Sequence, residues 1–204
     1  LAGNGWVTFS GTGALTATTG AALTGGLDGT VQSAAYSAYL SAIEPYAFDV
    51  MIYDGAESTV QSAMMAFIRR IADEAGVYSQ LVASGLSNPD SRFVVNVGSG
   101  VTLADGTWWA GGALAGAKYN ESLTYASYPG AVKASPLLTS SGYEEALRAG
   151  KFVLFADDGV VKVEQDINSL VTFTEDIGEV FRKNRVMRLC NTIANDIYRQ
   201  FSAN

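Results

Sequence analysis

Histidine is absent from the 204 residues, and this absence excludes several large classes of enzyme chemistry. Without histidine the chain has no Ser-His-Asp or Cys-His nucleophile system, no histidine-containing zinc site and no ordinary proton shuttle near neutral pH. The single cysteine, Cys190, excludes an internal disulfide and a cysteine-rich metal site. Its apolar helical surroundings predict a small buried side chain.

Basic residues and long apolar runs are also scarce. Lys and Arg number 13 against 20 Asp and Glu, a net charge of -7, which argues against a nucleic-acid partner. The longest apolar candidate, residues 108–117, is about half the length needed to cross a bilayer, so we expect no membrane insertion. Since 48% of the residues are hydrophobic, the chain can still build a core for one compact domain or two small ones.

The first 29 residues differ in composition from the rest. Gly, Ala and Thr dominate them, and large apolar side chains are too few to pack a layer. We interpret residues 1–22 as a connector at the end of an upstream domain, with a possible last strand at 6–9, and residues 23–204 as the core domain. The chain begins with Leu1 and stops at Asn204 directly after a helical pattern, which predicts a fragment of something longer.

From Thr30 onward, helical and extended patterns alternate. Helices are predicted at 30–43, with Thr30 as the cap, and at 57–75, and strands at 48–53, 78–83 and 92–97. This alternation predicts an α/β fold with a mixed sheet flanked by helices.

The second half adds three helices and a hairpin. A helix at 107–120 carries Gly112 and Gly116 one turn apart, which favours close backbone approach to a neighbour, and a further helix is predicted at 139–149. Apolar runs at 151–155 and 160–164 flank Asp158-Gly159, which is typical of a hairpin. In the last helix, 179–201, periodicity predicts one buried and one solvent face. The buried set is Val186, Leu189, Cys190, Ile193, Ile197 and Phe201, and the solvent set is Arg185, Arg188, Thr192, Asn195 and Arg199.

Two kinds of catalytic or ligand site have to be considered. Gly98-Ser99-Gly100 follows a predicted strand, as in a dinucleotide loop, but Leu103 stands where a third glycine belongs and 101–103 reads as extended. Carboxylates that could hold a hard cation or act as acid and base are also typical of solvated turns. They are Asp49, Asp54, the pair Asp157 and Asp158, and the pair Glu164 and Asp166, whose two-residue offset in a strand would place both carboxylates on one face.

A cluster of basic residues stands out from the acidic background. Arg182, Lys183, Arg185 and Arg188 lie near the start of the last helix, where positive charge is unfavourable for the helix dipole. They form a candidate docking face for an acidic partner, although basic residues also commonly solvate the outer side of an amphipathic helix.

A series of segments in a fixed order carries a further signal: 23–29, 48–55, 88–101, 110–117, 120–125, 136–150, 163–174 and 181–188. Together these segments resemble the tail sheath proteins of contractile-tailed bacteriophages and related phage-tail-like particles. The similarity runs from about Leu23 to Phe201, with Asn191 as a departure where the family commonly has Asp.

The resemblance implies a structural subunit, the sheath-domain core of a larger multidomain protein, with no enzyme activity, metal or cofactor. It implies copies of itself and the inner tail tube as partners, with the baseplate and tail terminator. Such a subunit assembles in the bacterial host cytoplasm, becomes part of the virion tail and contracts to drive the tube through the host envelope. The fragment alone is expected to be monomeric or weakly associated. A nucleotide- or small-molecule-binding α/β enzyme, or a capsid-like or adhesive protein, remains the alternative.

Overall fold

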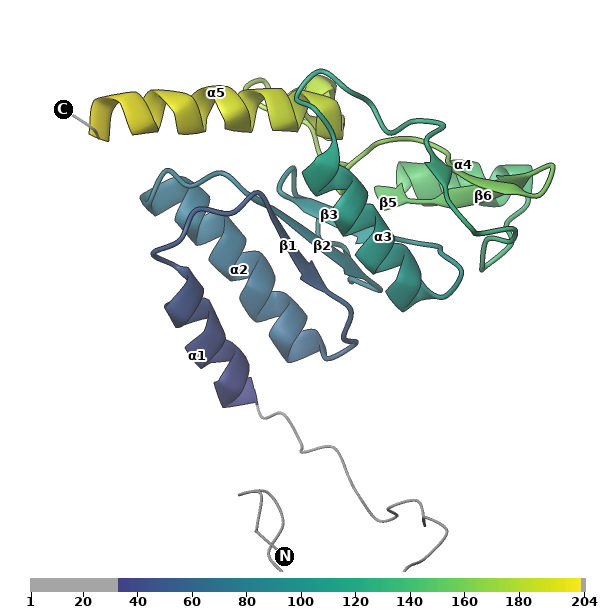
Figure 1. Ribbon diagram of the computed structural model, residues 1–204, viewed down its shortest axis with the longest axis horizontal. Coiled ribbons are helices and arrows are strands. Elements are labelled where there is room, and N and C mark those ends of the chain that lie inside the picture. Colours follow the sequence, from purple (N-terminus) through teal and green to yellow (C-terminus); the bar gives the residue numbers. More distant parts are fainter. Residues whose placement is uncertain (1–32, 203–204) are drawn as a thin grey trace, which may run out of the picture. The chain divides into compact units, whose positions relative to one another are not determined.

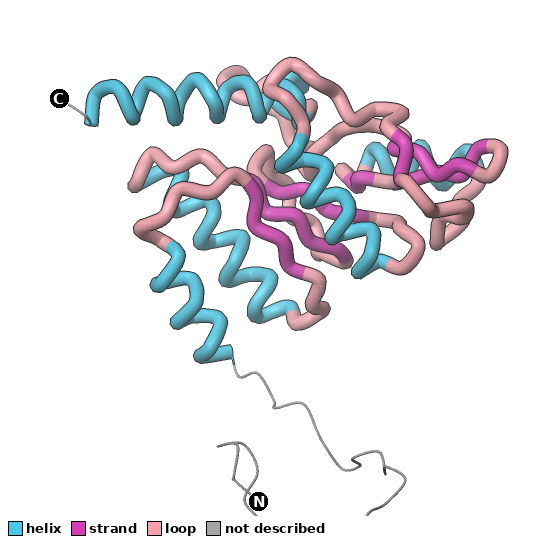
Figure 2. The backbone as a smooth tube through the Cα atoms, viewed as in Figure 1, coloured by secondary structure: helices cyan, strands magenta, loops and turns pink. Residues whose placement is uncertain are grey.

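The structure, a computed structural model, describes residues 33–202 (Figures 1 and 2). The predicted connector at 1–22, the strand at 6–9, the segment 23–29 and the Thr30 cap lie outside these residues. The helices are α1 (Ser33–Ile43), α2 (Ser58–Glu74), α3 (Leu103–Gly116), α4 (Ser140–Arg148), the 3-10 helix η1 (Glu179–Arg182) and α5 (Asn184–Ser202). The strands are β1 (Val50–Tyr53), β2 (Gln80–Ser84), β3 (Val94–Val97), β4 (Ser127–Tyr128), β5 (Lys151–Phe152), β6 (Leu154–Asp157) and β7 (Val160–Val163).

The main sheet has four parallel strands in the order β1-β2-β3-β5. Every residue of β2 and β3 is buried, as expected of central strands covered on both faces. Side chains of successive residues alternate between the two faces. Leu81 and Ala83 pack with α1 and α2 in one apolar cluster, whereas Val82 packs with α3 in another. The predicted α/β sheet is therefore present, with helices on both sides.

A second, antiparallel sheet has the order β4-β7-β6. The predicted hairpin is confirmed as β6 and β7, and Asp158 and Gly159 both have positive φ at the turn (47° and 74°), as a tight hairpin requires. The first predicted strand is divided, however. Lys151 and Phe152 pair with β3 in the main sheet, while the hairpin begins at Leu154. The two sheets together form the mixed α/β architecture.

The helix predicted at 107–120 lies at Leu103–Gly116, so the expectation that 101–103 is extended is wrong from Leu103 onward. The reason is a cap. The Thr102 hydroxyl accepts a hydrogen bond from the Asp105 backbone N–H (3.1 Å) and donates one to the Asp105 carboxylate (2.8 Å). This pair satisfies a free helix amide and starts the helix four residues earlier than its apolar pattern indicates.

The glycines that allow close approach on α3 are not the predicted ones. Gly112 and Gly116 face open space, so the expected small-residue stripe is wrong. A Cβ on Gly106 would lie 2.6 Å from the Ser99 carbonyl oxygen, and one on Gly111 would lie 2.4 Å from Ile52 Cδ1. The helix therefore contacts the β3–α3 loop through Gly106 and β1 through Gly111.

Within residues 33–202, no helix combines the length and the apolar character that crossing a membrane requires.

Two glycine-to-alanine substitutions on α3 test this packing. We expect Gly106→Ala to lower the free energy of unfolding by about 1–3 kcal/mol, because the new Cβ meets backbone atoms that cannot rotate away. Gly112→Ala should leave stability unchanged or raise it by up to about 1 kcal/mol, since alanine favours the helix and the site is open. Urea denaturation followed by circular dichroism measures the stability of both variants. Equal urea midpoints for the two variants would contradict the close backbone contact assigned to Gly106.

Candidate functional site: the carboxyl-terminal helix

A buried carboxylate holds the start of α5. The Asp166 side chain is 1% exposed, and its Oδ2 accepts hydrogen bonds from the Leu123 backbone N–H and from Arg188 Nη2, both at 3.1 Å. Its Oδ1 accepts one from Asn184 Nδ2 at 2.9 Å. Asp166 thus joins the segment after β7, the segment before β4 and the first turns of α5. We call Asp166, Asn184 and Arg188 the Asp166 anchor.

The arginine of the anchor is itself only 10% exposed. Its Nη2 also donates to the Glu121 carbonyl oxygen, whereas its buried Nε and Nη1 have no partner within residues 33–202. Burying a guanidinium is costly unless its charge is matched. The ion pair with Asp166 matches this charge. Removing either residue would leave the charge of the other buried and uncompensated.

More polar residues of α5 follow the same side of the helix. Asn184 Oδ1 accepts a hydrogen bond from Gln80 Nε2 at 3.1 Å. Further along, the Asn195 side chain exchanges two 3.4 Å hydrogen bonds with the backbone N–H and carbonyl of Tyr78. Positions 184, 188, 191 and 195 recur at helical spacing, and Asn191 is also buried. The polar side of α5 therefore faces the domain.

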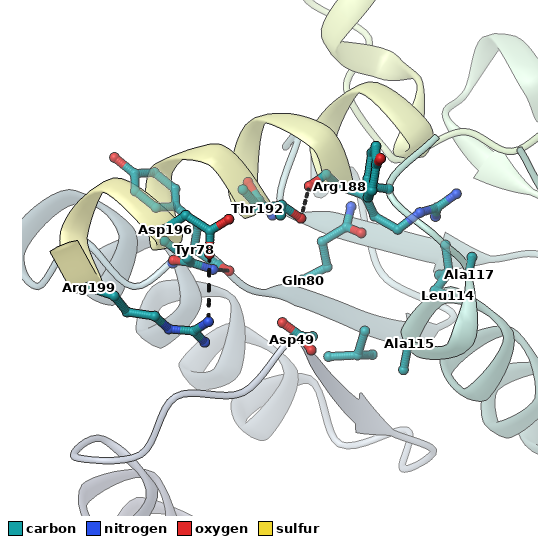
Figure 3. Close-up of a pocket in the computed structure, with 14 residues that line it drawn as sticks. Asp49, Tyr78, Gln80, Leu114, Ala115, Ala117, Arg188, Thr192, Asp196 and Arg199 are labelled. Carbon is teal, nitrogen blue, oxygen red and sulfur yellow. Dashed lines mark hydrogen bonds and ion pairs between the residues drawn. The ribbon is translucent and has the colours of Figure 1, made fainter. Parts of the chain in front are cut away.

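A polar cleft of about 270 Å³ lies along this side of α5 (Figure 3). Asp49 before β1, Gln80 on β2 and Arg188 on α5 line it. Within the described residues there is no group of three or more His, Cys, Asp or Glu side chains that could hold a metal ion. The hydrogen bonds of Gln80, Arg188 and Asn195 along this cleft are packing contacts within the domain.

The other predicted carboxylate sites are distributed over the structure rather than brought together. Asp54 accepts a hydrogen bond from Trp108 Nε1 (3.0 Å), and Asp157 pairs with Lys162 (2.8 Å) across the hairpin. Asp158 occupies the hairpin turn. Of the predicted pair Glu164 and Asp166, only Asp166 is fully buried, as the centre of the anchor.

The glycine loop is occupied by the chain's own contacts. The Gly100 N–H donates to the Ser135 carbonyl (2.9 Å), and the Ser99 hydroxyl accepts a hydrogen bond from the Leu154 N–H (2.6 Å). Asp105 places a carboxylate in the first turn of α3, where a phosphate would otherwise bind. The loop joins β3 to α3 but does not present a phosphate-binding cradle.

The basic cluster is divided by its surroundings. Arg182 donates from Nη2 to the Leu147 carbonyl oxygen, and burial lowers the pKa of its guanidinium. Arg188 belongs to the anchor. Lys183 and Arg185 are exposed, and only Lys183 has a partner in the described chain, a long contact to Gln165 (3.5 Å). Of the four basic residues, only these two are exposed.

The predicted buried set of the last helix is wrong, whereas Arg185, Thr192 and Arg199 are exposed as predicted. The helix is also divided, since η1 ends at Arg182 and α5 begins at Asn184. The apolar side chains expected inside are largely exposed, at 51% for Ile193, 54% for Ile197 and 81% for Phe201, and Cys190 is exposed as well. Asn195 and Arg188, expected in solvent, face the domain instead. The hydrogen bonds to Asp166 and Tyr78 hold the polar side inward.

A model of the family described as phage tail sheath protein central domain matches residues 29–169. The chain belongs to this family. The sheath tail protein of Desulfitobacterium hafniense has a similar solved structure, with 43% sequence identity and a TM-score of 0.88 over 99% of this chain and 51% of that chain. The sheath tail protein of Listeria innocua is 33% identical, with a TM-score of 0.77 over 93% of this chain and 46% of that chain.

A curated relative, the phage-like element PBSX protein XkdK of Bacillus subtilis (strain 168), is 36% identical over 100% of this chain and 50% of its own length. The chain thus spans about half the length of the sheath proteins it matches. The family is a structural one of the phage tail, which agrees with the predicted α/β sheath core and supports a structural role in a tail sheath.

The polar groups described above position α5, which begins after residue 169, where the central-domain match ends. Sequence reasoning missed the anchor because it grouped Asp166 with Glu164. An available signal was the spacing of Asn184 and Arg188, which places both on one side of a helix.

Substitutions of two aspartates test the anchor. We expect Asp166→Asn to lower the free energy of unfolding by about 3–5 kcal/mol, because it leaves the buried Arg188 charge unmatched. Asp157→Asn removes an ion pair at a site that is 59% exposed and should cost less than about 1 kcal/mol. Urea denaturation of the two variants and the unsubstituted chain provides the comparison. A cost for Asp166→Asn as small as that for Asp157→Asn would show that the anchor does not hold α5.

Proposed function

We propose that this chain is part of a subunit that polymerises around the inner tube of a contractile phage tail and contracts to drive the tube through the host envelope. The observation that carries the proposal is the match of residues 29–169 to the sheath central domain, together with the 0.88 TM-score to a sheath tail protein. The partners are copies of the same subunit, the tube, the baseplate and the tail terminator. Assembly takes place in the host cytoplasm.

The full subunit is proposed to be about twice as long as this chain, because relatives match over about half of their length. Contacts that link neighbouring subunits then lie largely in the remaining half, and the 204 residues alone are monomeric. A strand from a neighbour's chain can add to an exposed edge of a sheet. This is one general way to hold such subunits together while their bodies move.

Lys183 and Arg185 are the residues we propose for docking to the tube or to a neighbouring subunit. They are exposed, they carry positive charge on a chain of net charge -7, and they lie at the junction of η1 and α5. An acidic surface on the partner would complement them. Arg182 and Arg188 contribute by holding this junction in place.

Electron microscopy tests the assembly proposal. The full reading frame that contains these residues, expressed beside the 204-residue chain, should form hollow tubes in negative stain because sheath subunits contact one another in a lattice. The shorter chain should sediment as a monomer. Dispersed particles from both chains, or tubes from the shorter one, would contradict the proposal.

Charge reversal tests the docking residues. Lys183→Glu combined with Arg185→Glu should reduce the fraction of tubes that carry sheath, because repulsion replaces attraction at an acidic partner. Thermal stability should stay within about 0.5 kcal/mol, as for other exposed sites. Arg148→Glu, at a side chain 81% exposed on α4, is the matched control and should leave assembly normal. Normal sheathing by the double variant would exclude these residues from docking.

A further inference from the structure

The apolar side of α5 faces away from the domain. Leu189, Ile193, Ile197 and Phe201 recur at helical spacing along it, with Cys190 among them, and we call these five residues the α5 stripe. Each of the four large side chains is at least 41% exposed. In Figure 1 the carboxyl-terminal end of α5 extends beyond α2. Phe201, close to the end of α5, is the most exposed side chain of the stripe.

Leaving such a stripe in water is unfavourable. Burial of a large aliphatic or aromatic side chain is favourable, so exposure of the whole stripe forgoes a large part of the stabilisation that α5 could provide. The helix cannot turn to bury it against the domain, because the opposite side is fixed by Asp166 at one end and by Tyr78 further along. A contiguous exposed apolar stripe of this kind is typical of an interaction surface.

We propose that the α5 stripe is the docking surface for a further domain of the same polypeptide, contributed by the half of the subunit that lies outside these 204 residues. This inference rests on the proposed longer sheath subunit. The central-domain match ends at residue 169, before α5 begins, whereas the D. hafniense structure aligns with 99% of this chain. In a solved sheath protein, then, α5 is part of the subunit but lies beyond the central domain.

The size of the stripe favours a tethered partner over a second copy. A stable interface between separate proteins buries about 800 Å² on each side and must overcome the lost translational and rotational freedom of the partners. A segment of the same polypeptide is held near the stripe by its linker, at an effective concentration of the order of millimolar. It therefore needs a smaller interface than a separate protein does. A single helical stripe of a few partly exposed side chains is enough to hold a tethered domain.

Cys190 is a natural reporter for this proposal, because it is the chain's only cysteine and belongs to the stripe. Its alkylation by N-ethylmaleimide is followed by mass spectrometry of the peptide that contains it, in the dispersed, monomeric full-length subunit. We expect alkylation at least about tenfold slower than in the urea-unfolded subunit, and close to the unfolded rate in the 204-residue chain. Equal rates in the native full-length monomer and the 204-residue chain would overturn the proposal.

A second variant separates docking from misfolding. Ile193→Asp with Ile197→Asp should restore fast alkylation of Cys190 in the full-length subunit while leaving the circular dichroism of the 204-residue chain unchanged, since both side chains are exposed there. Thr192→Asp adds charge to the same helix outside the stripe and should keep Cys190 protected. Slow alkylation in the Ile193/Ile197 variant would contradict docking at the stripe.

The remaining outcomes are also decisive. Protection that appears only as protein concentration rises would identify a second copy as the occupant and overturn the tethered domain. Because the labelling is done on dispersed monomers, it does not depend on tube formation. If Cys190 is protected in the monomer but the full-length subunit does not form tubes, the result counts against the proposed sheath function and leaves the docking proposal standing.

Discussion

The Asp166 carboxylate joins three parts of the chain that are far apart in sequence: the segment after β7, the segment around Leu123 and the start of α5. Each of its oxygens accepts at least one hydrogen bond in a site closed to water. A buried ion pair of this kind adds little net stability compared with apolar packing of the same volume. Its effect is geometric, since it fixes which side of α5 meets the domain and at what register.

The orientation of α5 shows where sequence patterns stop being informative. The period of the apolar residues correctly predicts a long helix with one apolar side. Periodicity does not say what covers that side, and the assumption that it must be this domain's own core produced the wrong set of buried residues. The hydrogen bonds of Asn195 and Arg188 decided the orientation, and the helical spacing of polar residues does not by itself say that their side is buried.

Elements that bury apolar side chains within the described region were predicted well. The expected helix at 57–75 lies at Ser58–Glu74, and the expected strands at 78–83 and 92–97 lie at Gln80–Ser84 and Val94–Val97. The start of α3 was missed because the glycines weakened its helical pattern while the Thr102 cap, a single residue, decided the boundary. The role of Gly106 could not be predicted either, because it depends on the β3–α3 loop folding back against the helix.

The two sides of α5 differ in the kind of contact they can make, and this difference constrains motion in the proposed sheath. The polar side uses directional hydrogen bonds and a buried ion pair, so turning or sliding α5 would leave the Arg188 charge buried without its partner, at a cost of several kcal/mol. The stripe offers non-directional apolar contact, which tolerates small shifts. Consequently α5 and the central sheet move as one body, and a domain docked on the stripe moves with them. In the proposed sheath, rearrangement during contraction would then take place between subunits, where packed interfaces can exchange one arrangement for another.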